Sequence, residues 1–220
     1  MKVLISGTSR GIGRAVAIRF LSLGHQVYGL DLLPSSIEDK NYVHSVCDAS
    51  KKESLPKIED IELAFINHGT QLGEEDIDNN LRGSINIAET YVKNRSIKAV
   101  LFNASASART GDEFPYYVAS KAGVVGYMKN LAMELAEKYK ATCNAISFGG
   151  VITESTSKLV EDKELFNKIM EVTPLKKWAE EDEICDWVTF LLLQNKSMSG
   201  QDILIDNGET NLNRKFVWKD

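Results

Sequence analysis

The stretch Ser6-Gly7-Thr8-Ser9-Arg10-Gly11-Ile12-Gly13 joins an apolar segment of strand length, 2–6, to a segment of helical period, 12–23. Its glycines follow the spacing G-x-x-x-G-x-G, which permits a tight turn, close approach of the backbone to a pyrophosphate, and close packing of the helix on the strand. The first amides of the helix then offer free N–H groups and partial positive charge to an anion. The stretch therefore predicts a phosphate cradle with contacts from Gly7, Ser9, Arg10, Gly11, Ile12 and Gly13, the alternative being a purely structural glycine turn.

The rest of the chain continues the alternation of apolar strand-length segments with longer helical ones. Expected strands are 2–6, 26–30, 62–67, 98–103, 142–148 and 202–206, and expected helices are 12–23, 116–139 and 182–193. This alternation implies right-handed crossovers and a mostly parallel sheet with helices on both faces. No stretch has the composition of an interdomain linker. We therefore predict a single α/β domain over residues 1–220, with a doubly wound, three-layer Rossmann fold.

The composition is that of an ordinary globular protein, with 43% hydrophobic and 26% charged residues and a net charge of -5. The basic residues form only short pairs, so no nucleic-acid surface is expected. Three widely spaced cysteines, Cys47, Cys143 and Cys185, predict reduced thiols, with no disulfide framework or metal site. No signal peptide and no apolar run of about 20 residues appear, so we expect a cytoplasmic protein without a membrane partner.

An acidic residue ends the second expected strand. Asp31 follows Gly13 by 18 residues. A carboxylate there suits the ribose hydroxyls of NAD and repels the extra phosphate of NADP. Arg10, within the glycine stretch, could meet that phosphate instead. The sequence thus favours NAD, with NADP as the alternative.

The sequence Tyr117-Val118-Ala119-Ser120-Lys121 places a tyrosine and a lysine four residues apart near the start of an expected helix. Residues at this spacing share one helical face. An ammonium group beside a phenol favours the phenolate and lowers its pKa, so the tyrosine could exchange a proton with a substrate oxygen. Alone, this pair is equally typical of an amphipathic surface. The glycine stretch upstream makes the catalytic interpretation the better one.

Together these motifs resemble those of the short-chain dehydrogenase/reductase family in its compact form, over nearly the whole chain. Further matches, in order, are Cys47-Asp48, Ile66-Asn67-His68-Gly69, Asn80-Leu81-Arg82-Gly83, Asn103-Ala104-Ser105-Ala106-Ser107, Asn144 to Thr153, Ser199-Gly200-Gln201 and Asp206-Asn207-Gly208. The order and spacing of these partial matches are more specific than any one of them.

The resemblance implies a role for each site residue. Tyr117 is the expected acid/base, and Lys121 is expected to hold the nicotinamide ribose and lower the tyrosine pKa. Ser105 is expected to bind the substrate oxygen, with Ser107 as the alternative, and Asn80 to anchor a water in the proton relay. Beyond the glycine stretch and Asp31, the residues expected to contact the cofactor are Asp48, Asn67, Gly69, Tyr117, Lys121, Val151 and Thr153.

The chain departs from the family pattern at several places. Phe148 replaces a proline that usually precedes Gly149, a change expected to loosen the loop over the nicotinamide. His68 occupies an alanine position, as a ribose contact or as a loop histidine satisfied within the protein. Ile66 is the other altered residue of its motif. Only 10 residues separate Gly69 from Asn80, which is shorter than usual.

Residues 154–173 are expected to form one or two short amphipathic helices that cover the substrate, or simply a packing helix. Their acidic residues are Glu154, Glu161, Asp162, Glu164 and Glu171. This charge disfavours large polyanionic substrates such as acyl-carrier-protein thioesters.

The expected function is hydride transfer between a nicotinamide cofactor and a secondary alcohol or ketone. The alternative is a catalytically weak NAD(P)-binding regulator on the same fold. A sugar-nucleotide epimerase is disfavoured because it needs a larger substrate domain. By resemblance to the family, the expected assembly is a homodimer or homotetramer.

Overall fold

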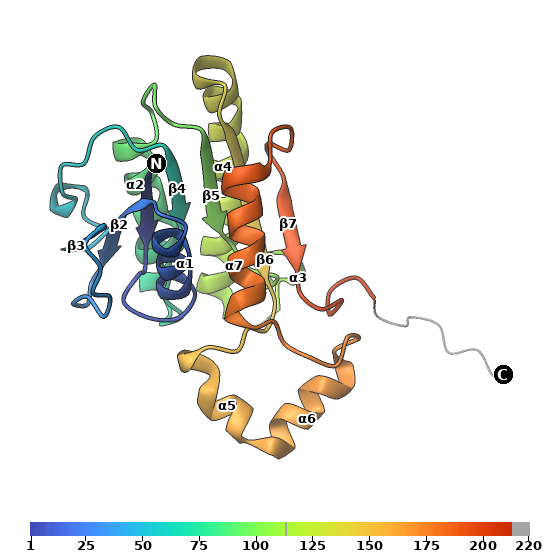
Figure 1. The fold of residues 1–220 in the computed structure, drawn as a ribbon. Coiled ribbons are helices and arrows are strands. Elements are labelled where there is room, and N and C mark those ends of the chain that lie inside the picture. The colour runs from blue at the N-terminus through green and yellow to red at the C-terminus, as the bar shows by residue number, and fades with distance from the viewer. Residues whose placement is uncertain (113, 213–220) are drawn as a thin grey trace.

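A computed structural model describes residues 1–112 and 114–212. The predicted domain extends over 213–220, which lie outside the described residues. In the described part of the chain, seven strands form one parallel sheet in the order β3-β2-β1-β4-β5-β6-β7 (Figure 1). The strands are β1 (Lys2–Ser6), β2 (Gln26–Asp31), β3 (Tyr42–Val46), β4 (Leu63–Ile66), β5 (Ala99–Asn103), β6 (Thr142–Phe148) and β7 (Asp202–Ile205). The order reverses between β1 and β4, and ligands of such sheets bind at the carboxyl ends beside this switch point.

Helices cover both faces of the sheet. The helical segments are α1 (Gly11–Ser22), η1 (Lys52–Ser54), η2 (Ile77–Arg82), α2 (Gly83–Tyr91), α3 (Ser107–Thr110), α4 (Pro115–Tyr139), η3 (Glu154–Thr156), α5 (Ser157–Glu161), α6 (Lys163–Val172), α7 (Glu181–Thr189) and η4 (Phe190–Gln194). Helices α1 and α7 pack together on the near face in Figure 1, and α2 and α4 lie on the far face. The predicted three-layer Rossmann fold is therefore confirmed.

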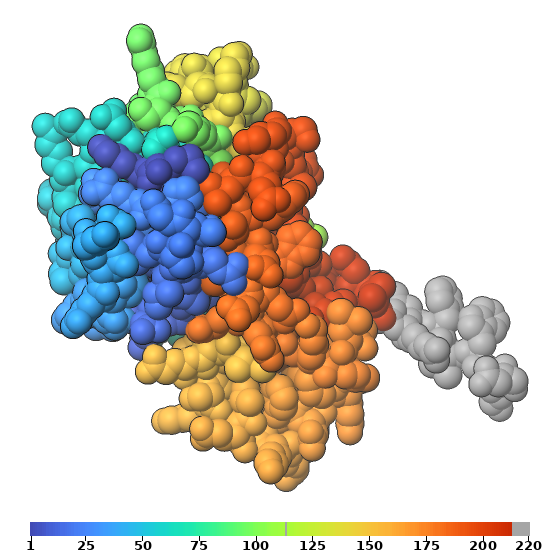
Figure 2. All heavy atoms as spheres, viewed as in Figure 1, coloured from blue at the N-terminus to red at the C-terminus, as the bar shows by residue number. Residues whose placement is uncertain are grey.

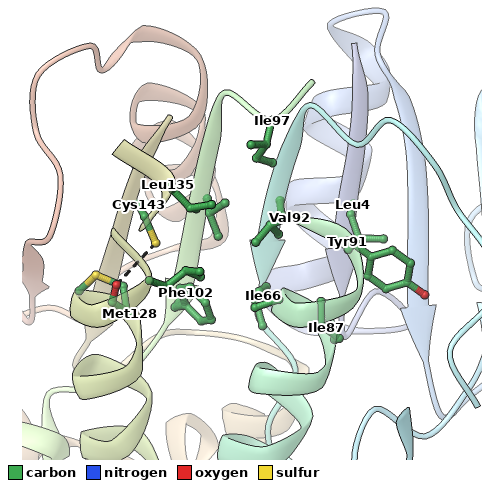
Figure 3. Packing of buried hydrophobic residues seen from close by; sticks show 14 of the residues in the cluster. Leu4, Ile66, Ile87, Tyr91, Val92, Ile97, Phe102, Met128, Leu135 and Cys143 are labelled. Carbon is green, nitrogen blue, oxygen red and sulfur yellow. Dashed lines mark hydrogen bonds between the residues drawn. The ribbon is translucent and has the colours of Figure 1, made fainter. Parts of the chain in front are cut away.

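Two apolar clusters hold the layers together, one on each side of the sheet. Figure 3 shows the α2/α4 side, where Ile87 and Tyr91 of α2 face the sheet and Phe102 of β5 lies beside α4. The Cys143 thiol donates to the carbonyl of Met128, 3.8 Å away, and so joins β6 to α4. All three cysteines are free and buried. Strands buried on both faces need continuous apolar runs, which is why the sequence showed them clearly.

Strand β3 was missing from the prediction. None of its residues is buried, because it is an edge strand with only β2 beside it. A short edge strand with His44 and Ser45 in it lacks the apolar signal of the central strands. The other predicted strands and helices are confirmed, with ends that differ by at most four residues.

The 154–173 segment folds as η3, α5 and α6, which confirms the predicted short helices. These helices form a V that projects beyond the carboxyl ends of the strands (Figure 1), and in the space-filling view they make a separate lobe below α1 and α7 (Figure 2). No residue of α5 or α6 is buried.

Candidate active site

The glycine loop between β1 and α1 has the geometry that its spacing predicts. Gly7 and Gly11 adopt the left-handed region, with φ of +76° and +54°. A Cβ on Gly13 would lie 2.0 Å from the carbonyl oxygen of Gly7, so only glycine fits there. A Cβ on Gly11 would meet nothing closer than Thr153, at 3.9 Å. The loop is thus tight where it packs on itself and open where a ligand would approach.

The N-terminus of α1 is suited to bind an anion. Its N-cap, Arg10, makes no side-chain capping hydrogen bond and is exposed, and the first turn carries no acidic residue. The initial amides of a helix have no intrahelical acceptor, so they can donate to a phosphate. This open cradle, with Gly13 packed behind it, fits the pyrophosphate of a dinucleotide. Gly7, Ser9, Arg10, Gly11 and Ile12 are the residues that would surround it.

The Asp31 carboxylate, at the carboxyl end of β2, lies against this loop. It accepts the backbone N–H groups of Ser9 and Leu33, both at 2.9 Å. The Ser9 hydroxyl in turn donates to the Leu33 carbonyl at 3.1 Å. Asp31 therefore fixes the glycine loop to the turn after β2, in addition to any contact with a ribose.

Asp48 follows the edge strand and is held within its own turn. Its Oδ1 accepts from the Ser50 amide and hydroxyl, and its Oδ2 pairs with Lys51 at 3.0 Å. These hydrogen bonds, the Ser50 hydroxyl first, lower the pKa of Asp48.

His68 is satisfied within the protein. Its Nε2–H donates to the Asn79 carbonyl at 3.1 Å, and its Nδ1 accepts from the Ser6 hydroxyl at 2.8 Å. Burial, assisted by the charge of Lys121, lowers the pKa of His68 to about 4, so the ring is neutral. A Cβ on Gly83 would lie 2.6 Å from Nε2, so the histidine occupies the space that Gly83 leaves open. Of the two interpretations of His68, this geometry supports the loop histidine.

Asn67, Asn103 and Lys121 connect the glycine loop to α4. Asn67 donates from Nδ2 to the Ser6 carbonyl at 3.1 Å and accepts from Nδ2 of Asn103 at 2.9 Å. The Lys121 ammonium donates to the Asn103 carbonyl at 2.9 Å. A Cβ on Gly69 would lie 3.0 Å from Nζ of Lys121 and 3.2 Å from Oδ1 of Asn80. The absence of a side chain at Gly69 therefore leaves a space that both groups border.

Tyr117 and Ser105 meet at the carboxyl end of β5. Ser105 is buried, and its hydroxyl comes close enough to the Tyr117 phenol to lower the pKa of that group. Ser107 reaches the pair only through Ser105, with the two hydroxyl oxygens 2.7 Å apart. The neighbouring Tyr116 points elsewhere, because it is exposed and donates to Glu74 at 3.1 Å. The arrangement brings Ser105, rather than Ser107, to the tyrosine.

The expected lowering of the Tyr117 pKa by Lys121 was wrong for this arrangement. Burial raises the pKa of Tyr117, and the hydrogen bond from Ser105 only partly opposes it. The Lys121 ammonium lies 5.7 Å from the centre of the tyrosine ring and is committed to the Asn103 carbonyl. Burial also lowers the pKa of Lys121 to about 8. Desolvation is the largest cause of both pKa shifts.

Asn80 lies in η2, a π-helical turn that continues into α2. Its Oδ1 accepts from the Thr70 amide at 2.7 Å, and its Nδ2 donates to the Thr70 carbonyl at 2.9 Å and to Ser120 Oγ at 3.0 Å. The Ser120 hydroxyl donates to the Tyr117 carbonyl at 2.7 Å. The fully buried asparagine therefore ties the β4–η2 turn to α4. Single π-helical turns of this kind are frequent at functional sites.

The segment after β6 returns to the glycine loop. Val151 forms a parallel bridge with Ala179, and Thr153 begins η3 opposite Gly11. Phe148 completes β6 in register with Ile205 and is buried, so the apolar side chain extends the strand at the usual proline position. Thr70 and Ser120 also support the site through Asn80, although the sequence gave neither residue a role.

Comparison with known proteins agrees with this geometry. A sequence model of the family described as Enoyl-(Acyl carrier protein) reductase matches residues 64–210. The 3-oxoacyl-[acyl-carrier-protein] reductase of Staphylococcus epidermidis is 27% identical over 239 residues, covering 93% of this chain and 97% of that protein. The L-xylulose reductase of Caenorhabditis elegans is 28% identical, covering 96% of each chain.

Solved structures share the fold. A 4-hydroxyisoleucine dehydrogenase mutant complexed with NADH and succinate superposes with a TM-score of 0.87 at 23% identity, covering 96% of this chain and 98% of that chain. In the described residues no helix is long and apolar enough to cross a membrane. The chain belongs to the short-chain dehydrogenase/reductase family of nicotinamide-dependent oxidoreductases.

Proposed function

We propose that this protein transfers a hydride between a nicotinamide cofactor and a secondary alcohol or ketone, with Tyr117 as the acid/base. The observation that carries the proposal is the meeting of Tyr117, Ser105 and Lys121 at the carboxyl end of β5. Hydrogen bonds through Asn103 and Asn67 connect this group to the glycine loop. Proton transfer and dinucleotide binding therefore fall at one edge of the sheet.

Each residue has a distinct task in the proposed reaction. The cofactor supplies or accepts the hydride at the substrate carbon. In the direction of reduction, the Tyr117 hydroxyl donates its proton to the substrate oxygen while Ser105 donates a hydrogen bond to the same atom. The buried Lys121 ammonium holds positive charge near the tyrosine ring and would hold the ribose of a bound cofactor. Because burial raises the Tyr117 pKa, the free residue is in the protonated form that reduction requires.

The space beside Gly69 suits the proton relay. Asn80 and Lys121 both border it, and a side chain at residue 69 would fill it. A water there could accept a hydrogen bond from the Lys121 ammonium and donate one to Oδ1 of Asn80. The side-chain amide of Asn80 already hydrogen-bonds to the backbone of Thr70 and to the Ser120 hydroxyl, so we assign Asn80 a positioning role as well.

We further propose that residues 154–173 cover the substrate and that the chain acts as a single domain. Two contacts anchor the second half of the segment. Thr173 is fully buried and donates to Glu209 at 2.7 Å, and Phe166 packs edge-on against Trp178 with ring centres 5.4 Å apart. The acidic residues of the segment keep acidic carrier-protein thioesters disfavoured, so small uncharged or weakly charged alcohols are the favoured class.

The cofactor assignment remains NAD ahead of NADP, because the Asp31 carboxylate faces the glycine loop where an added phosphate would lie. Homodimeric or homotetrameric assembly stays a prediction from the family. Light scattering coupled to size-exclusion chromatography tests it directly.

The central experiment compares two adjacent tyrosines. Purified protein is titrated with NADH and NADPH by fluorescence and then screened with alcohols and ketones by absorbance at 340 nm. Tyr117→Phe is expected to lower turnover about 10²- to 10⁴-fold while leaving cofactor affinity unchanged. The matched control, Tyr116→Phe, removes a hydroxyl bonded only to exposed Glu74 and is expected to leave turnover unchanged.

Two results would count against the proposal. No binding of either cofactor at millimolar concentration would reject the nicotinamide site. Cofactor binding without turnover across the screen would favour the alternative, a regulator that senses the cofactor.

A further inference from the structure

Asp76 is a buried carboxylate in the turn between β4 and η2. The residue is 1% exposed. Its Oδ1 accepts from the Thr70 hydroxyl at 2.8 Å and the Leu72 amide at 2.9 Å, and its Oδ2 accepts from the Gly73 amide at 3.2 Å. Among the described residues, no cation lies within ion-pair distance of it. A buried charge without an ion pair is costly, so this one needs a reason to be there.

Hydrogen bonds connect Asp76 to α4, the helix that carries Tyr117 and Lys121. Asp76 holds the side chain of Thr70, and the backbone of Thr70 holds both ends of the Asn80 amide. Asn80 then reaches the Tyr117 carbonyl through the hydroxyl of Ser120. Every link between Asp76 and the first turn of α4 is thus a direct hydrogen bond.

The same carboxylate acts electrostatically on the catalytic pair. Burial lowers the pKa of Lys121, and Asp76 is the charge that opposes this effect. Asp76 also adds to the raised pKa of Tyr117, after burial as the main cause. One negative charge therefore favours the protonated form of both groups.

We propose that Asp76 is a positioning residue of the active site, which fixes the Thr70–Asn80 turn against α4 and provides a negative charge to the site that Tyr117 and Lys121 share. The proposal rests on the proposed function, in which Lys121 must carry a positive charge and Tyr117 a transferable proton.

Other charged groups around the pair do not take this role. His68 faces Lys121 from the end of β4 but is neutral, with its pKa lowered to about 4 by burial. On the side of η2, Asp78 pairs with Arg82 at 2.9 Å, and both are largely exposed. Glu74 is bonded to Tyr116 at the surface.

The test separates the charge of Asp76 from its hydrogen bonds. Asp76→Asn removes the charge at nearly constant shape. Thr70→Val is the matched control, because it removes the hydroxyl that Asp76 holds and keeps the carboxylate. Asp76→Ser is a second neutral variant that can still accept hydrogen bonds in the turn, should the asparagine variant fold poorly.

The first readout needs neither cofactor nor substrate. Phenolate formation is followed by absorbance at 295 nm, and the titration of each protein is compared with that of the same protein carrying Tyr117→Phe. The difference between the two titrations is the titration of Tyr117 alone. Removing the negative charge is expected to move this titration to lower pH in Asp76→Asn and Asp76→Ser, and to leave it unchanged in Thr70→Val.

The second readout is the pH dependence of kcat/KM. Loss of the Asp76 charge lowers the pKa of both Tyr117 and Lys121, so the whole profile is expected to move to lower pH. A purely structural role would lower the rate without moving the profile. An unmoved phenolate titration in both neutral variants, or an equal shift in Thr70→Val, would overturn the proposal. If the wild-type protein neither binds a cofactor nor turns over a substrate, the proposed function is wrong. The phenolate titration would still decide the role of Asp76.

Discussion

The glycine loop and the α5–α6 segment border the same end of the sheet, yet they are built in opposite ways. The loop is packed so closely that a methyl group on Gly13 would collide with the backbone. The α5–α6 segment has no buried residue and projects from the body of the molecule (Figure 1). The contrast shows that the glycine loop is fixed by close packing, while the fold places few demands on the α5–α6 segment, to which we assign substrate choice as a proposal.

The largest expected effect is that of Gly13→Ala in the loop. The new Cβ would lie 2.0 Å from the Gly7 carbonyl oxygen, so the turn must distort. We expect NADH affinity to fall more than 100-fold and the melting temperature to drop clearly, measured by fluorescence titration and calorimetry. Gly126→Ala is the control, because nothing lies within 4 Å of its added Cβ in α4 and the substitution should stabilise by roughly 0.5–1 kcal/mol. An unchanged NADH affinity in Gly13→Ala would show that the glycine loop does not depend on close packing at this residue.

Next in size is the loss of the serine hydroxyl beside Tyr117. Ser105→Ala is expected to lower kcat about 10²- to 10³-fold, because one donor to the substrate oxygen is lost. Ser107→Ala removes only the partner of Ser105 and should cost far less. Steady-state kinetics of both variants with one substrate measure the two losses of kcat. A larger loss of kcat in Ser107→Ala than in Ser105→Ala would make Ser107 the residue that binds the substrate oxygen.

A third effect concerns His68, which supports the loop side of the site. Its pKa of about 4 in the folded protein lies below the value of about 6.5 in the unfolded chain, so the unfolded state takes up the proton first as pH falls. Stability should therefore fall from about pH 6.5 down to pH 4, by about 2 kcal/mol between pH 7 and pH 5. Urea unfolding at these two pH values measures the loss, and His68→Gln should lack this part of it. Equal losses in both proteins would show that the ring is not buried in its neutral form.

A smaller effect is expected at Asp31. Asp31→Asn keeps an acceptor for the Ser9 or Leu33 amide and removes the charge. The ratio of NADPH to NADH affinity should rise on the order of tenfold, as repulsion of the extra phosphate is relieved. Fluorescence titration with both cofactors provides the ratio, and an unchanged value would place the discrimination elsewhere.

The smallest effect belongs to the α5–α6 segment. Leu165 is 45% exposed, so Leu165→Ala should change stability by less than about 0.5 kcal/mol. In contrast, Phe102→Ala in the core should cost about 3–5 kcal/mol (Figure 3). If the segment closes over the substrate, Leu165→Ala should raise KM with little change in cofactor affinity. A stability loss as large as that of Phe102→Ala would show that the segment is part of the core.

The sequence was most informative where local chemistry is specific. The apolar runs of the central strands and the glycine spacing predicted the sheet and its cofactor loop, because each depends on residues close together in the chain. The edge strand β3 gave no such signal, since none of its residues is buried. The Y-x-x-x-K spacing placed Tyr117 and Lys121 on one helix, but their protonation depends on burial, which no local pattern records.

By itself, the sequence determined the fold class, the family motifs and the main candidates for the site. Only the tertiary structure could decide that Ser105 rather than Ser107 acts on the pKa of Tyr117, that His68 is neutral within the loop, and that the charge of Asp76 acts on Lys121. The physical reason is that these properties come from groups far apart in the chain, which burial brings together in a medium of low dielectric constant. There, desolvation and a single charge set the protonation of a side chain more strongly than its neighbours in sequence.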